Sequence, residues 1–184
     1  ISIYISNFSM YSTNHKGGYG FYFEHCININ ISNQTITGLG GGAYFFEGGF
    51  VHNINNVYIF GCNHNPLYQE NFGAIHQNRT TEGNNFTIDQ CYISNNTLAT
   101  GIITGGQGNR IINSAIESSQ TLIQIGQEGY VSRSNIIEGC YFENPKTNGH
   151  ILLKNTINTF INSCYFNDNP EALYSIKIEG PETR

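Results

Sequence analysis

The sequence predicts an all-β protein, a single-stranded right-handed parallel β-helix of about seven coils. Three observations lead to this prediction. A six-residue frame recurs along the chain, a second short apolar run follows each copy, and the composition favours short strands and tight turns. Repetition at intervals of roughly 20 to 50 residues indicates a solenoid, in which each repeat stacks on the next.

The repeated frame begins with Ile, has a small or amide residue at its third position, and has Cys at its fourth position in four copies. The clearest copies are residues 137–142 (IEGCYF) and 161–166 (INSCYF). Successive fourth positions are 26, 28, 29, 23, 26 and 24 residues apart, which predicts one frame in every coil. The seven copies are residues 5–10, 31–36, 59–64, 88–93, 111–116, 137–142 and 161–166.

We interpret each frame as a strand, a one-residue corner and a second strand. Side chains at positions one, four and six then face one interior, provided that position three turns the chain. Asn and Gly tolerate the left-handed backbone conformation that such a turn needs. Corner amides can also hydrogen-bond along the stack. The predicted corners are Asn7, Asn33, Gly61, Gln90, Asn113, Gly139 and Ser163.

A second apolar run follows each frame and keeps pace with it. No run has the 3.6-residue period of a helix, which excludes a solenoid of strands and helices. A one-residue corner does not permit a hairpin, which excludes antiparallel pairs. The remaining arrangement is a stack of parallel strands about 4.8 Å apart. Longer loops are expected at residues 63–72 and 77–85. The runs are residues 20–23, 43–46, 73–76, 101–104, 122–125, 150–153 and 174–178.

Composition and charge narrow the class of protein. The 184 residues fit one domain, and 11% charged with 13% aromatic residues argues against disorder. The net charge is −5, and the eight Lys and Arg form no basic run, so we expect no nucleic-acid partner. No apolar stretch approaches membrane-spanning length, so we expect no membrane insertion. We expect residues 1–184 to form one β-helix domain. Bare strand edges at both ends need a cover, so we expect either that the domain is a fragment of a longer chain or that another chain covers its ends.

Four of the five cysteines occupy the same position in the frame. We interpret them as buried free thiols that act as small hydrophobic side chains; a disulfide framework is the weaker alternative. No CxxC pair or matching Cys/His spacing occurs, so we expect no metal and no cofactor. The four residues are Cys62, Cys91, Cys140 and Cys164.

The frame, its period and phrases such as residues 135–144 (NIIEGCYFEN) resemble the pectate-lyase-like β-helix superfamily, and within it bacteriophage tailspikes and related polysaccharide depolymerases. The resemblance implies a homotrimer in the virion tail, outside the cell, that binds and cuts a bacterial surface polysaccharide. A secreted or cell-surface bacterial protein is the alternative. The family's catalytic motifs do not transfer, because Asp89 and Asp168 are the only aspartates and they lie far apart.

Candidate site residues come from the outward side of the second apolar runs, whose register the sequence leaves open by one residue. Glu24 and Glu47 lie one coil apart, and glycoside hydrolysis uses two carboxylates about 5 to 10 Å apart. Elimination from a uronate would instead use a base such as His76 and a cation such as Arg79, with Glu82 in the same loop.

Aromatic residues crowd the coils before residue 50, and exposed rings suit sugar faces. We expect Tyr22, Tyr44, Phe46 and Tyr68 to bind substrate, and we place the site on residues 19–82. The outward column of Tyr92, Tyr141 and Tyr165 favours a subunit interface, because it is regular and lacks acids.

Two functions therefore stay open. One is an enzyme that degrades capsule, O-antigen or exopolysaccharide, as a glycoside hydrolase or a polysaccharide lyase. The other is a non-catalytic β-helix shaft or receptor-binding segment of a phage or cell-surface fibre.

Overall fold

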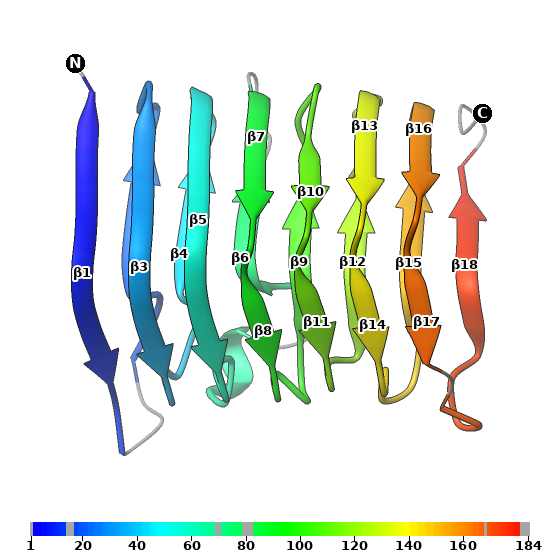
Figure 1. Cartoon of the computed structure of the whole chain (residues 1–184), viewed down its shortest axis with the longest axis horizontal. Helices are drawn as coiled ribbons and strands as arrows, with labels where there is room; N and C mark the ends of the chain where they lie inside the picture. Colours follow the sequence, from blue (N-terminus) through cyan, green and yellow to red (C-terminus); the bar gives the residue numbers. More distant parts are fainter. Residues whose placement is uncertain (1, 14–16, 69–70, 79–82, 168, 181–184) are drawn as a thin grey trace.

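The computed structural model is a β-solenoid of parallel strands, as the sequence predicts (Figure 1). It describes residues 2–13, 17–68, 71–78, 83–167 and 169–180. One sheet has 11 strands and contains the frames, with each corner bending the sheet into two arms. These strands are β1 (Ile3–Tyr11), β3 (Ile29–Thr37), β5 (Phe50–Phe60), β7 (Asn84–Asp89), β8 (Tyr92–Ser94), β10 (Arg110–Ile112), β11 (Ala115–Glu117), β13 (Ser132–Glu138), β14 (Tyr141–Glu143), β16 (Thr156–Asn162) and β17 (Tyr165–Asn167).

The second sheet has seven strands and closes the other side of each coil. In the described residues the only helical element is the 3-10 turn η1 (Pro66–Tyr68), and no helix there is long and apolar enough to cross a membrane. Its strands are β2 (Phe21–Glu24), β4 (Tyr44–Glu47), β6 (Gly73–Asn78), β9 (Thr100–Thr104), β12 (Thr121–Ile125), β15 (Gly149–Lys154) and β18 (Tyr174–Glu179).

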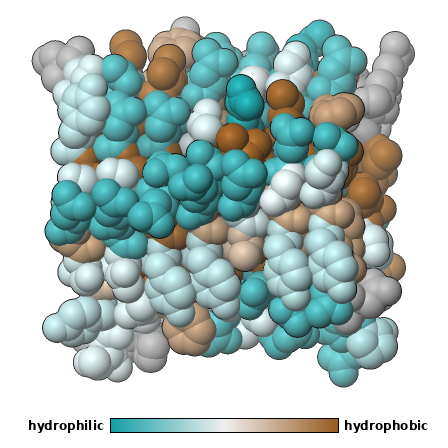
Figure 2. Space-filling model, viewed as in Figure 1, coloured by the Kyte–Doolittle hydropathy of each residue, from teal (hydrophilic) through white to brown (hydrophobic). Residues whose placement is uncertain are grey.

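The predicted left-handed corners are confirmed in six of the seven frames. Their φ angles lie between 49° and 62°, at Asn7, Asn33, Gln90, Asn113, Gly139 and Ser163. Amide ladders cross between coils: the Asn56 side chain donates to Asn33 Oδ1 at 2.8 Å, and the Asn113 side chain donates to Asp89 Oδ1 at 3.0 Å. A hydrophilic band crosses the middle of this face at the level of the corners (Figure 2).

The third frame lies five residues earlier than predicted. Ile54 pairs with Ile88, and Asn56 forms the corner with a φ of 52°. Gly61 is also left-handed, but it follows the end of β5. Two segments here have Ile two residues before a turning residue, and only pairing with the neighbouring coils distinguishes them. The corrected corner places 34 residues between Asn56 and Gln90, the widest step of the stack.

The interior is a set of ladders of Ile, Phe and Cys side chains. Cys91 and Cys140 are buried and Cys164 is partly buried, all as free thiols in the fourth position of the frame. Burial raises the pKa of Cys91 to about 12, so this thiol stays protonated and packs as an apolar group. Cys62 is buried and free but lies outside this ladder, because the register of the third coil gives its fourth position to Val57.

The register of the seven-stranded sheet corrects the predicted direction of two substrate-binding aromatic side chains. Tyr44 and Phe46 have 0% exposure and face the interior, so their predicted outward positions are wrong. Phe46 pairs with Phe23, another core residue, whereas Phe45 pairs with Tyr22 and faces outward. Residues 43–46 are apolar on both faces of the strand, so alternation alone did not distinguish the two phases.

Candidate functional site

A hollow lined by five aromatic rings lies on the outer face of the seven-stranded sheet. Its volume is about 210 Å³. Tyr22 stacks on Phe45 with ring centroids 5.2 Å apart, and Tyr19 packs against Phe45 at 5.0 Å and Tyr68 at 5.7 Å. Two of the predicted substrate-binding residues, Tyr22 and Tyr68, therefore lie in one hollow. The lining residues are Tyr19, Tyr22, Phe45, Tyr68 and Phe72.

Glycines in the turn before β4 let the Tyr19 ring lie against the sheet. A Cβ at Gly42 would come within 2.5 Å of the Tyr19 ring and 2.4 Å of the Gly73 carbonyl oxygen. Tyr19 donates its hydroxyl hydrogen to that carbonyl at 3.2 Å. Any larger side chain at Gly42 would push the ring away, so this glycine shapes the floor of the hollow.

The turn that carries Tyr68 is held by asparagine side chains. Asn63 donates to the Tyr68 carbonyl at 2.8 Å, and Asn65 Oδ1 accepts from the Leu67 amide at 3.1 Å. The backbone N–H of Asn65 in turn donates to the Gly40 carbonyl of the neighbouring coil at 2.8 Å. These bonds satisfy a surface loop locally and fix one wall of the hollow.

Two carboxylates lie beside the aromatic hollow. Glu24 and Glu47 are paired in the parallel register of β2 and β4, which places their backbones about 4.8 Å apart. The Tyr22 hydroxyl donates a hydrogen bond to Glu47 Oε2, and this bond raises the pKa of Tyr22 to about 12. Glu24 is exposed and Glu47 is half-buried. Side chains on the same face of neighbouring strands can bring two carboxyl groups within the range of about 5 to 10 Å that glycosidases use.

His76 packs against aromatic rings of the hollow and is a poor match for a general base. It is 7% exposed and packs against Phe45 and Phe72, with centroid distances of 4.9 Å and 5.7 Å. Its Nδ1 lies 3.4 Å from the Tyr19 hydroxyl. Burial lowers the pKa of His76 to about 3, so the ring is neutral near pH 7. A general base works best with a pKa near the working pH, so the structure favours a packing role.

A polar hollow adjoins the aromatic one and extends the site along the stack. It has a volume of about 220 Å³ and is lined by His76, which packs against Phe45 and Phe72 of the aromatic hollow. Lys154 and Glu128 form an ion pair there at 3.7 Å. The site therefore reaches beyond the predicted range of residues 19–82. The other lining residues are Asn71, Asn78, Ile103, Gln124 and Gln127.

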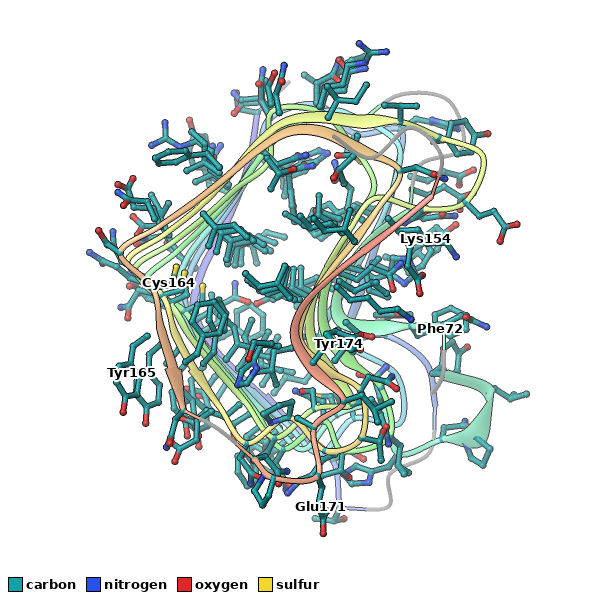
Figure 3. All side chains as sticks on the ribbon, turned by 90° about the vertical axis from the view of Figure 1, so that its right-hand side faces the viewer. Phe72, Lys154, Cys164, Tyr165, Glu171 and Tyr174 are labelled. Atoms are coloured by element: carbon teal, nitrogen blue, oxygen red, sulfur yellow. The ribbon has the colours of Figure 1, made fainter. Side chains whose placement is uncertain are left out.

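Together the two hollows follow six neighbouring strands from β2 to β15, a length of about 24 Å at the usual strand spacing. Figure 3 looks along the stack and shows Phe72 and Lys154 on this side of the molecule. Arg79 and Glu82, the other predicted site residues, lie outside the described residues. Within the described ranges no cluster of three His, Cys, Asp or Glu side chains could hold a metal ion.

Sequence reasoning missed the contribution of Phe72 and the polar hollow. Phe72 follows the η1 turn, where no strand alternation indicates its direction. Gln124 and Gln127 are common polar residues, and only the stacking of β12 beside β9 and β15 brings them to the site. Comparison of the chain with protein-family models, curated proteins and solved structures finds no match.

Proposed function

We propose that this chain is a tailspike-type protein that binds a bacterial surface polysaccharide along the outer face of its seven-stranded sheet. One observation supports the proposal above the others: five aromatic rings and two carboxylates line one side of a rigid parallel sheet. Aromatic faces pack against the apolar faces of pyranose rings, and carboxylates and amides accept or donate hydrogen bonds to sugar hydroxyls.

The shape of the site supports a chain-like ligand. The aromatic and polar hollows follow one another along the stack, so an extended glycan could contact rings at one end and the Gln124 and Lys154 side chains at the other. Tyr22, Phe45 and Gln124 lie on strands with paired backbones, which keeps these side chains preorganised for binding.

Binding is tested by passing purified capsule, O-antigen and exopolysaccharide samples over the immobilised protein and measuring retention. We expect Tyr22→Ala and Tyr68→Ala to reduce retention about tenfold each, the loss of roughly 1.4 kcal/mol. Tyr11→Ala is the matched control, because Tyr11 is 77% exposed on β1 and lies outside the hollow. Equal retention by all three variants would contradict the proposed site.

A second candidate function is cleavage of the bound polysaccharide, for which the paired carboxylates of Glu24 and Glu47 are the specific support. One would act as general acid and the other as nucleophile or base. New reducing ends without absorbance at about 232–235 nm would indicate hydrolysis, whereas absorbance there would indicate the unsaturated uronate of an elimination. Activity that survives both Glu24→Gln and Glu47→Gln would exclude this pair as the catalytic groups.

The non-catalytic alternative is a shaft or receptor-binding segment of a phage or cell-surface fibre. It predicts retention of the glycan with no new ends in either assay. We place the protein in a virion tail, or at a bacterial surface as the alternative, and we propose a homotrimer from the resemblance to tailspikes. Sedimentation of the parent protein as a monomer would contradict the trimer.

A further inference from the structure

An incomplete ladder of tyrosines runs along the arm of the 11-stranded sheet that contains β8, β11, β14 and β17. Tyr58 stacks on Tyr92 with centroids 5.1 Å apart and an interplanar angle of 6°. Tyr141 stacks on Tyr165 at 5.3 Å and 5°. The parallel register places Ala115 between Tyr92 and Tyr141. One ring is therefore missing between two stacked pairs.

The gap above Ala115 has the width of one flat group. Tyr92 and Tyr141 are two strand spacings apart, or about 9.6 Å, so a group midway lies about 4.8 Å from each ring. Aromatic partners usually stack at centroid distances of roughly 4.5 to 7 Å. Ala115 is partly exposed and extends only a methyl group into this space, which we call the slot.

Two carboxylates border the slot, which corrects the expectation that this column lacks acids. Glu117 and Glu143 are paired in the register of β11 and β14. The Tyr92 hydroxyl donates to Glu117 Oε2 at 2.9 Å, and the Tyr141 hydroxyl donates to Glu143 Oε2 at 2.9 Å. Glu143 Oε1 also accepts a hydrogen bond from the Asn167 side chain at 2.8 Å. Among the described residues, neither of the two ion pairs in the structure involves these carboxylates, so no cation balances their charge there.

We propose that this slot binds a planar cation, the guanidinium group of an arginine side chain from another protein. Two like charges on adjoining strands repel one another, and a cation between them relieves that repulsion. Tyr faces attract a cation within about 6 Å of the ring centroid. A guanidinium group is flat and donates in its plane, so it stacks between Tyr92 and Tyr141 while it bonds to carboxylates at the rim. A tetrahedral ammonium group lacks this fit.

A different protein suits the slot better than a second copy of this chain. A basic segment of another protein is attracted to these two carboxylates more strongly than an acidic chain with a net charge of −5 is. The slot is also separate from the proposed glycan site, because Tyr165 of the same ladder lies on the opposite side of the stack from Phe72 and Lys154 (Figure 3). The two sites can therefore be tested independently.

The test uses calorimetric titration with the peptide acetyl-Gly-Arg-Gly-amide. Peptides with Lys or uncharged citrulline in place of Arg are the ligand controls. We expect the Arg peptide to bind at least about tenfold more tightly than either, since charge and planarity both contribute. The protein has no Trp, so quenching of tyrosine fluorescence is a second readout.

The decisive variant is Ala115→Tyr, which completes the ladder and fills the slot. The new ring stacks on Tyr92 and Tyr141, so the fold is expected to persist, as circular dichroism can verify. Arg-peptide binding should fall at least about tenfold. Thr35→Tyr is the matched control, because Thr35 pairs with Tyr58 in the same column but lies away from the slot. Glu117→Gln keeps a hydrogen-bond acceptor for Tyr92 and should weaken binding through the lost charge alone.

Several results would overturn the proposal. They are equal binding of the Arg and citrulline peptides, undiminished binding by Ala115→Tyr, or no Arg-peptide binding at millimolar concentration. Competition by a methyl glycoside would assign the slot to a sugar instead. An oligomer that dissociates in Ala115→Tyr would assign the guanidinium to a second copy.

Discussion

Truncation of the two adjacent phenylalanines on β4 should affect stability and glycan binding in opposite orders. Phe46 faces the interior, where it packs against Phe23 at 4.9 Å and Phe86 at 5.0 Å. Phe46→Ala leaves an enclosed void, and such changes cost about 3–5 kcal/mol. Phe45 faces the outer hollow, so its removal opens a space that water can enter. That change loses the transfer free energy of the ring, about 1.5–3 kcal/mol, without the added cost of a cavity.

The assay is thermal unfolding followed by circular dichroism, together with polysaccharide retention. In chains of roughly 150–250 residues, 1 kcal/mol lowers Tm by about 2–4 °C, so Phe46→Ala should lower it by about 6–20 °C. Phe45→Ala should lower Tm less, by about 3–12 °C. Glycan retention should follow the opposite order, because Phe45 contacts Tyr22 and Tyr19 in the proposed site.

Equal losses of Tm in the two variants, combined with equal retention of glycan, would refute the argument. That outcome would mean that the register of β4 does not separate a core face from a binding face. Phe46→Leu is a useful intermediate, since it keeps most of the apolar volume and should recover much of the lost stability.

Three further predictions concern backbone geometry and pH. Asn113 has a φ of 49°, so Asn113→Ala should lower the unfolding free energy by about 1–2 kcal/mol, as measured by chemical denaturation. Asn113→Gly should lower it less, because glycine adopts this conformation freely. Equal losses in the two variants would contradict a role of the left-handed corner. Gly126→Ala should prevent folding or strongly lower Tm. The added Cβ would lie 1.8 Å from the Lys154 carbonyl oxygen, and residue 126 has a φ of 85°. A variant with the wild-type Tm would contradict this geometry. His76 is neutral when folded, and burial lowers its pKa from 6.5 to about 3, so the unfolded chain binds more protons between these values. The free energy of unfolding should therefore be highest above pH 6.5 and decline as the pH falls toward 3. Denaturant titrations at several pH values should show a less steep decline in His76→Gln. Identical pH profiles would exclude His76 as a source of the pH dependence.

The corners were the most predictable feature of the fold. Asn7 and Asn33 stand two residues after an Ile, and the left-handed conformation that they adopt is a local property of the amide or glycine residue. Six of seven corners therefore follow from short-range chemistry. The free thiols at Cys91, Cys140 and Cys164 follow similarly from an apolar position that repeats with the frame.

The third coil and the phase of β4 needed the tertiary structure. Asn56 and Gly61 both adopt left-handed φ angles, so local preference does not select between them. Pairing of Ile54 with Ile88 selects Asn56. The Tyr-Phe-Phe run of β4 is apolar on both faces, and only its hydrogen-bonded register with β2 places Phe46 inside and Phe45 outside.

The sequence by itself therefore determined the solenoid and six of its seven corners, because each depends on residues close together in the chain. The tertiary structure decided which side chains meet across coils. Glu24 and Glu47, or Tyr92 and Tyr141 around Ala115, are brought together by strand register over 23 residues or more. A shift of one residue in that register would exchange the buried and exposed faces, so these groupings depend on the whole stack and not on local pattern.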